Sequence, residues 1–452
     1  MKVRTAAGLT GASMPLGIIL ASVLVQGVAA PAVAQQISAQ YAMPAMRDND
    51  DAPLRNSGGI GGASGYPGRG LQLGVGIVSR YESNLARLAT TASGYRVRPQ
   101  IDARYGIGLG QQGLYVEGLL ARDMFFGAPN LFHRNRYQAG AGLDYRLSRC
   151  SGQLGGSWQR SLVFQSEAVA FGAFEQESTR LGLNANCRIS GALSLDGSVA
   201  KQAFKTEVGL GNAFNVDTMS YSLGVSLGSA GLGQFSLSGS SSDSQMPGRL
   251  VITGAGLVED SLIQRNVRLG YSRKFGSKIN LGLGVSYINS QPGTDDQILV
   301  VDGVPQIVNR DGFKGAGFDA LLDINLSPRF DIQFTANRST FANPNVGAQF
   351  SLATNYSAVI NYRLNQRYSV AIGASRRENR FLGGFSSALD PFVRVSDTLD
   401  RFYGQIGTRL GKRLRLTFDV AHNRRNSNPA FLNFSSTGAG LNLGVQLGRG
   451  QR

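Results

Sequence analysis

The sequence predicts an all-β protein: a transmembrane up-and-down antiparallel β-barrel of about eighteen strands. Apolar and polar residues alternate in short segments from residue 70 to the end of the chain, which is the period of a strand with two different faces. The links between these segments are alternately short and long, as are the periplasmic turns and external loops of such a barrel. Beyond the N-terminus, no apolar run approaches the roughly 18 residues of a spanning helix.

The composition agrees with this fold class. The chain of 452 residues is 42% hydrophobic and contains 60 glycines but only 14 prolines, with a mean hydropathy close to zero. These values exclude a helical membrane protein but fit a barrel, whose spanning segments are half polar. The composition shows no break after residue 70, so residues 70–452 form one predicted barrel domain. A secreted soluble β-protein is the alternative.

Residues 1–34 have the features of a secretory signal peptide. Lys2 and Arg4 precede an apolar stretch, and a small-x-small triplet ending at Ala34 forms a cleavage site. We therefore expect cleavage near Ala34 and export to the outer membrane of a Gram-negative cell. Residues 35–69 lack any period and mix Gly, Pro, Asn, Asp and Ser, which predicts a flexible periplasmic extension.

Strand-like segments then follow one another to the end of the chain. The expected strands cover residues 70–80, 95–108, 114–126, 136–148, 153–164, 178–190, 193–204, 218–228, 234–243, 265–276, 279–289, 316–327, 330–340, 351–365, 368–377, 398–411, 414–424 and 436–448. The short links, expected at the periplasmic end, are LGQQG, SRCSG, Gly191-Ala192, SAGLG, Ser277-Lys278, Pro328-Arg329, Gln366-Arg367 and Lys412-Arg413. Long links such as residues 292–313 and 381–397 are expected at the opposite end.

Each strand has a polar and an apolar face. In the strand expected over 95–108, Ile101 and Tyr105 lie on one face, and Arg98 and Arg104 lie on the other. An Arg or Lys on the lipid-facing side at the centre of the membrane would cost about 2–4 kcal/mol. The charged faces must therefore line an aqueous interior, and the apolar faces must contact the lipid of the outer membrane.

The candidate functional residues are arginines at the alternate strand positions whose side chains face the interior, which we call the inward parity. They are Arg96, Arg98, Arg104, Arg136, Arg146, Arg180, Arg363, Arg377, Arg401, Arg409 and Arg415. A ring of arginines selects for anions in a pore, because a guanidinium suits carboxylate and phosphate groups. The alternative is that inward arginines and aspartates pair with one another and rigidify the lumen. The sequence leaves both interpretations open, and both can hold at different heights of the barrel.

Cys150 and Cys187 lie near the short-link ends of two consecutive strands. The chain is exported, so a disulfide can form and persist. Both cysteines have the parity of the apolar face, and we predict a structural disulfide between them. The alternative is two separate thiols that lie one register apart, because strand ends predicted from sequence carry an error of about two to four residues.

The sequence offers little for catalysis or metal binding. Its two histidines, His133 and His422, are isolated from any Ser or Asp in a triad-like grouping, so we expect no enzyme. Two isolated Cys and two isolated His provide no zinc-like spacing, and we expect neither a metal nor a cofactor.

The net charge of +16 comes from 45 Lys and Arg against 29 Asp and Glu. In a cytoplasmic protein such an excess would indicate nucleic-acid binding. Here it is spread over alternate strand positions of an exported chain, so nucleic acid is excluded as a partner. Small anions or lipid headgroups are the expected partners.

Three stretches, residues 80–88, 95–126 and 134–148, resemble a family of β-barrel porins associated with exopolysaccharide and capsule biosynthesis clusters. In that family a Y-x-x-N segment follows the first strand, and Tyr81-Glu82-Ser83-Asn84 matches it here. The resemblance implies an outer-membrane barrel that passes or helps to assemble an anionic polysaccharide. The last strand departs from the usual barrel-assembly signal, because it ends on Leu447 with no terminal Phe. Outer-membrane lipid and the barrel-assembly machinery are the partners such a fold requires.

These observations predict a porin-like channel with an arginine-rich lumen, acting as a passive or export conduit, with exopolysaccharide as one candidate cargo. A general diffusion porin for small solutes is the first alternative. A non-conducting barrel that acts through its surface loops is the second.

Overall fold

The computed structural model describes residues 70–85, 87, 92–127, 133–163, 174–207, 215–229, 231–301, 304–310, 312–342, 348–382, 395–411 and 413–448. The predicted signal peptide and the predicted extension over 35–69 lie outside these residues. Within the described part, no helix is long and apolar enough to cross a membrane.

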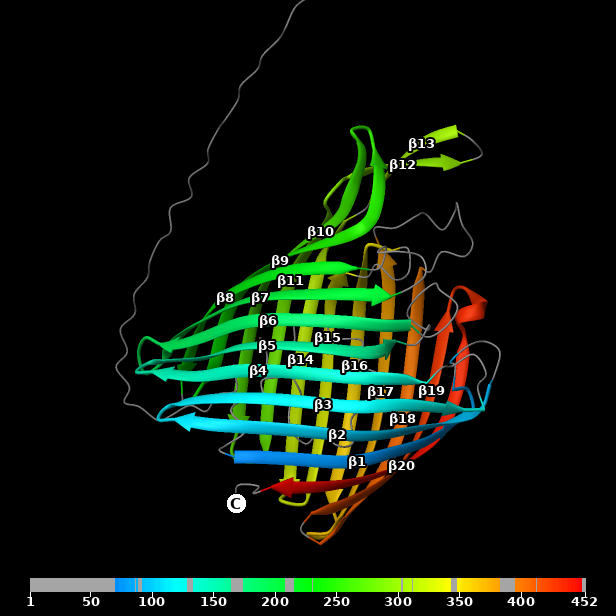
Figure 1. The fold of residues 1–452 in the computed structure, drawn as a ribbon. Helices are drawn as coiled ribbons and strands as arrows, with labels where there is room; N and C mark the ends of the chain where they lie inside the picture. Colours follow the sequence, from blue (N-terminus) through cyan, green and yellow to red (C-terminus); the bar gives the residue numbers. More distant parts are fainter. Residues whose placement is uncertain are drawn as a thin grey trace, which may run out of the picture.

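Eighteen strands form one closed antiparallel sheet, and a separate two-stranded hairpin lies between the eleventh strand and the twelfth (Figure 1). The barrel strands are β1 (Gly70–Glu82), β2 (Gly94–Leu109), β3 (Gln112–Phe126), β4 (Arg134–Leu147), β5 (Cys150–Val163), β6 (Phe174–Arg188), β7 (Leu193–Glu207), β8 (Val216–Ser229), β9 (Gly233–Thr253), β10 (Gly256–Phe275), β11 (Ile279–Pro292), β14 (Phe313–Ser327), β15 (Phe330–Ala342), β16 (Phe350–Arg363), β17 (Tyr368–Leu382), β18 (Ser396–Leu410), β19 (Leu414–Ser427) and β20 (Phe434–Gly448). The hairpin consists of β12 (Asp296–Val301) and β13 (Val304–Asn309). The predicted up-and-down barrel of about eighteen strands is confirmed.

The barrel closes where the first strand pairs with the last. β1 runs antiparallel to β20 from Gln72 opposite Gly448 to Glu82 opposite Gly438. Beyond this ladder, the backbone N–H of Thr437 donates a hydrogen bond of 2.9 Å to Oγ of Ser83. Closure matters because lipid offers no partner for an exposed N–H or C=O group, so a spanning sheet must have no open edge.

Every barrel strand exposes at least one large apolar side chain. Leu223, Val285 and Ile372 are among the most exposed of these side chains, at 63%, 62% and 60%. Soluble proteins rarely expose contiguous apolar patches larger than a few hundred Å². This surface is therefore that of a transmembrane barrel surrounded by lipid, as the alternation of faces predicted.

The strand ends joined by the eight short links lie at one end of the barrel, which we call the short-turn end. Gly70 at the start of β1 and Gly448 at the end of β20 lie at the same end. Gly110 and Gly411 lie in two of these turns with φ of 66° and 81°, a conformation that strongly favours glycine. The strand ends joined by the longer connections lie at the other end, which we call the long-loop end.

Two hairpins at the long-loop end differ from the prediction. β9 and β10 extend about ten residues beyond the segments 234–243 and 265–276 that the alternation indicated, and the β12–β13 hairpin lies within the predicted loop 292–313. Pro247 and Gly248 interrupt the alternation, and the β9–β10 register shifts between Glu259 and Asp260. Figure 1 shows the tips of β9 and β10 projecting past their neighbours.

Candidate functional site

A cavity of about 1470 Å³ lies against the inner wall at the short-turn end of β15 to β19. Seven arginines and two aspartates contribute to its lining. They are Arg80, Arg329, Arg363, Arg367, Arg401, Arg409, Arg415, Asp331 and Asp419. The charged lining thus carries a formal excess of five positive charges.

Three neighbouring turns bring these arginines together. Oδ1 of Asn365 accepts hydrogen bonds from the backbone N–H groups of Arg367 and Tyr368 at 2.8 and 2.9 Å, which shapes the β16–β17 turn around an Asn side chain. The N–H of Arg363 donates to the carbonyl of Arg329 at 2.7 Å, and that of Arg409 donates to the carbonyl of Arg367 at 2.9 Å. Adjacent hairpins are therefore joined at the turns themselves, which fixes the spacing of their side chains.

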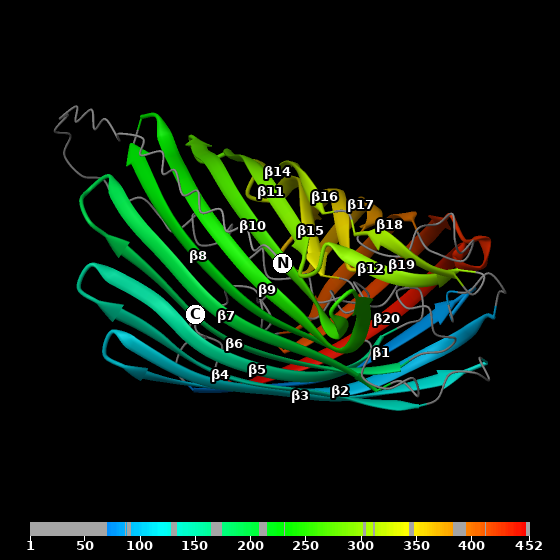
Figure 2. The ribbon, with the colours of Figure 1, turned by 90° about the horizontal axis from the view of Figure 1, so that it is seen from above.

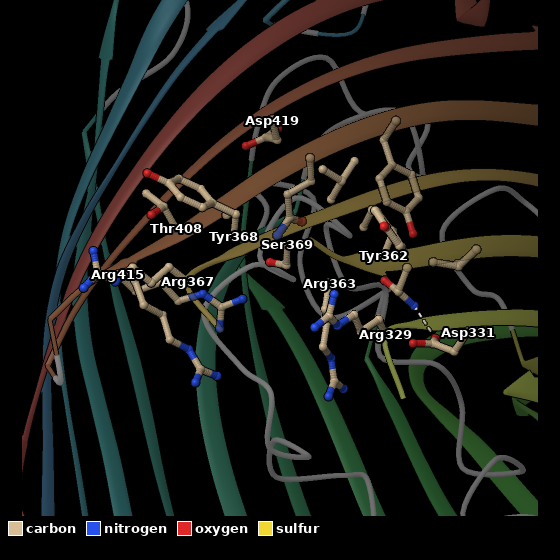
Figure 3. Close-up of a pocket in the computed structure, with 18 of the residues that line it drawn as sticks. Arg329, Asp331, Tyr362, Arg363, Arg367, Tyr368, Ser369, Thr408, Arg415 and Asp419 are labelled. Carbon is tan, nitrogen blue, oxygen red and sulfur yellow. Dashed lines mark hydrogen bonds between the residues drawn. The ribbon is translucent and has the colours of Figure 1, made fainter. Parts of the chain in front are cut away.

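The guanidinium groups of this cluster are open to water. Figure 3 shows Arg329, Arg363 and Arg367 extending into the cavity. These three side chains and Arg409 are exposed, and within the described part of the chain no carboxylate lies within 4 Å of their guanidinium groups. Asp331 instead accepts a hydrogen bond of 2.8 Å from Asn361. The positive charge of the cluster is thus available to a solute.

Two arginines of the cluster face one another across a strand pair. Arg409 in β18 lies directly opposite Arg415 in β19, an arrangement in which like charges repel. The same wall carries Arg401, whose guanidinium lies 5.5 Å from the ring centre of Tyr403. Asp419 is engaged by Arg80, whose Nη1 donates to Oδ2 at 2.6 Å. An anion between Arg409 and Arg415 would relieve their repulsion.

The other predicted arginines lie elsewhere on the inner wall, and most of them engage protein groups. Arg98 and Arg136 each donate to Asp123 at 2.6 Å, and Arg96, two residues before Arg98 in β2, is buried. Nε of Arg104 lies 3.5 Å from the carboxylate of Glu117.

The remaining three predicted arginines also lie outside the cavity. Arg377 donates to Asn379 at 3.0 Å and stacks near the ring of Phe341. Arg146 is exposed near the short-turn end of β4, and Arg180 is half-buried in β6. Of the predicted set, the structure gathers Arg363, Arg401, Arg409 and Arg415 in the cavity and distributes the rest over the wall.

Sequence reasoning missed Arg80, Arg329 and Arg367. Arg80 has the inward parity of β1 and could have been included on that ground. Arg329 and Arg367 lie in two-residue turns, where strand alternation gives no direction for a side chain. The signal available was a repeated pattern, because the links Pro328-Arg329, Gln366-Arg367 and Lys412-Arg413 all carry a basic residue at their second position.

Cys150 and Cys187 lie directly opposite one another in the β5–β6 ladder and form a disulfide, with their Cα atoms 4.0 Å apart. His133 accepts a hydrogen bond from the N–H of Phe125 at its Nδ1, and His422 contacts Thr437. In the described ranges, no three His, Cys, Asp or Glu side chains gather in a way that could hold a metal ion.

No protein-family model matches the chain, and no curated protein matches it significantly. Among solved structures, the outer membrane protein OpdK from Pseudomonas aeruginosa is 11% identical with a TM-score of 0.43, covering 84% of this chain and 99% of that one. A BenF-like porin from Pseudomonas fluorescens is 12% identical with a TM-score of 0.44, covering 83% and 98%. OccAB3 from Acinetobacter baumannii is 11% identical with a TM-score of 0.43, covering 83% and 98%.

Proposed function

We propose that this chain is an outer-membrane porin whose lumen prefers anions, and that the arginine cluster at the short-turn end is its selectivity site. The observation that carries the proposal is the cavity on the inner wall, with seven arginines against two aspartates. Clefts lined by one sign of charge raise the local concentration of the opposite ion, and rings of arginine favour anions in pores.

Other parts of the inner wall support this division of labour. Where arginine and aspartate meet, as in the contacts of Arg98 and Arg136 with Asp123, the carboxylate offsets part of the arginine charge and holds neighbouring strands together. Where the arginines Arg363, Arg367 and Arg409 extend into the cavity, their charge acts on the solute.

The alternatives make different predictions about conductance. A general diffusion porin would conduct without a preference for anions, and a non-conducting surface barrel would show no current. Export of an anionic polysaccharide, which the family resemblance implies, stays a prediction, and a polyanion would meet the same arginines.

The test is the single-channel conductance of the refolded protein in a planar bilayer under a KCl gradient. We expect an open channel whose reversal potential shifts toward that of chloride. In the triple variant Arg363→Gln, Arg409→Gln and Arg415→Gln, the ratio of chloride to potassium permeability should fall by roughly two- to tenfold, because three charges leave the lining while the strand pairing stays.

Arg376→Gln is the matched control. Arg376 lies in β17, between the strands that carry Arg363 and Arg409, but it is exposed on the outer face, where it donates to Glu378 at 2.8 Å. Its loss should therefore leave the permeability ratio unchanged. Heat-modifiable migration on gels verifies that each variant is folded. A folded wild-type barrel that is cation-selective, or a triple variant that keeps the wild-type ratio, would contradict the proposal.

A further inference from the structure

At the long-loop end, the part of the inner surface on β7 to β10 is covered by protein instead of water. Met246 in β9 and Leu262 in β10 have the inward parity of their strands, yet both are 0% exposed. They belong to an apolar cluster with Phe204, Val216, Ala342 and Phe350. Residues on the inner wall of an open lumen would be wet, as Arg363 and Arg409 are at the other end, so a second layer must pack on this part of the wall.

That second layer consists of the parts of β15 and β16 nearest the long-loop end, which we call their upper ends. The β14–β15 ladder stops at Phe318 opposite Arg338. The β11–β14 ladder continues further toward the long-loop end, to Ser290 opposite Phe313. Above this point β15 therefore leaves its neighbour.

The direction in which it leaves is inward. Thr340 of β15 and Ser290 of β11, two strands away, have their hydroxyl oxygens 2.8 Å apart. Arg338 lies 5.9 Å from the ring centre of Phe313. Ser290 has the inward parity of β11 and is 0% exposed. The upper part of β15 thus passes inside the wall formed by β11 and β14, and Phe350 of β16 packs on the inner face of β9 and β10.

A buried carboxylate holds this layer in place. Asp260 in β10 is 1% exposed. Nη1 and Nη2 of Arg310, which follows β13, donate to its two oxygens at 2.9 and 3.0 Å. Nε of Arg249 in β9 lies 3.0 Å from it, and Nε2 of Gln349, just before β16, donates to it at 2.9 Å.

Two further hydrogen bonds join the same elements. Gln349 also donates to the carbonyl of Ser261, and Arg249 donates to the carbonyl of Ala348 at 2.8 Å. One carboxylate therefore connects the β9–β10 tip, the β12–β13 hairpin and the start of β16. Figure 2 shows the tips of β9 and β10 and the β12–β13 hairpin within the outline of the barrel seen from above.

We propose that the upper ends of β15 and β16 form a shutter that narrows the long-loop mouth, and that Asp260 is the latch that keeps it folded inward. The inference rests on the proposed function for its consequence, which is that the shutter sets the upper size of solute the channel admits. Selectivity by charge and selectivity by size are then assigned to opposite ends of one lumen.

The latch itself can be tested without any transport. Ser290→Cys places a thiol beneath the shutter at a position that is 0% exposed, and the two native cysteines are joined in a disulfide that does not react with maleimide. A bulky water-soluble maleimide should label this thiol slowly. In the Asp260→Asn background, which removes the charge and keeps the shape, we expect labelling roughly tenfold faster or more, because local opening becomes easier.

Asp243→Asn is the matched control, because Asp243 lies in β9 but is exposed on the outer face. It should leave the labelling slow. Equal labelling rates in the Asp260→Asn and Asp243→Asn backgrounds would overturn the latch.

The size limit is tested separately by swelling of proteoliposomes in sugars of graded size. Asp260→Asn should admit larger sugars than the wild type, and the chloride preference should persist because the arginine cluster is untouched. An unchanged size limit together with fast labelling would reject the size filter and keep the latch. A wild type that admits no solute, with an Asp260→Asn variant that does, would reject the passive porin and support the shutter.

Discussion

Single residues on the inner wall show how charged side chains fit against a closed sheet. Arg268 in β10 donates to Asp319 in β14 through two hydrogen bonds of 2.6 Å. The pair spans β11, and the residue beneath it is Gly284. A Cβ at Gly284 would touch both the carboxylate and the guanidinium. Part of the high glycine content of the chain therefore makes room for ion pairs that lie flat on the wall.

We predict that Gly284→Ala destabilises the barrel by about 1–3 kcal/mol, the usual cost of overpacking a filled site. Urea unfolding followed by the heat-modifiable gel shift measures the change. Gly404→Ala in β18 is the control, because nothing lies within 4 Å of a Cβ built there. Equal unfolding midpoints for the two variants would show that the Arg268–Asp319 pair does not need this space.

For a single arginine, the sequence predicted which side of the wall the side chain faces but not which group it binds. Strand parity placed Arg98 and Arg363 on the same inner surface, and both side chains lie there. Parity could not distinguish the arginine that binds Asp123 from the one that extends into the cavity. That difference depends on which strands are neighbours and on the height at which each side chain meets the next strand.

Among the elements, β5 and β6 are joined both by their ladder and by the disulfide between Cys150 and Cys187. These two cysteines are 37 residues apart in the chain. In the chain-entropy model, closing a loop of this length stabilises the fold by about 3–4 kcal/mol. We therefore predict that Cys150→Ala with Cys187→Ala lowers the urea midpoint. Added reductant should lower the wild-type midpoint toward the same value and leave the double variant unchanged. A wild type insensitive to reductant under unfolding conditions would contradict this.

Sequence patterns identified the regular elements but not the irregular ones. The strand expected over 279–289 is observed as Ile279–Pro292, whereas the one expected over 234–243 extends to Thr253. Pro247 and Gly248 are ordinarily turn residues, and here they form a bulge that lets the hairpin continue and bend. The contacts of Asp260 that favour this shape come from Arg310 and Gln349, which are distant in the sequence.

For the whole molecule, the charge distribution predicts a salt dependence. The exposed arginines act through water, and the screening length falls from about 10 Å at 0.1 M salt to about 3 Å at 1 M. The chloride preference should therefore decline as KCl rises, and it should decline less steeply in the triple arginine variant. Reversal potentials at constant gradient ratio and rising total salt measure this. A preference independent of salt would assign selectivity to another part of the lumen.

The closed architecture followed from the sequence because the alternation and the alternating link lengths extend over the whole barrel. The departure of β15 from β14 above Phe318 could not be foreseen, since the local pattern of both strands continues through it. The cavity was foreseen only in part, because the turns that complete it have no strand period.

The pairing of β1 with β20 has a consequence for the order in which the protein can form. Ser83 and Thr437 hydrogen-bond across 354 residues of chain, so the first strand is synthesised long before its second neighbour exists. Until then the outer edge of β1 offers unpaired backbone groups to any other strand, a known route to aggregation. Folding dominated by such distant contacts is also slow. The nascent chain must therefore be kept apart from its own copies during transit, and the ring becomes complete only after its last segment has arrived.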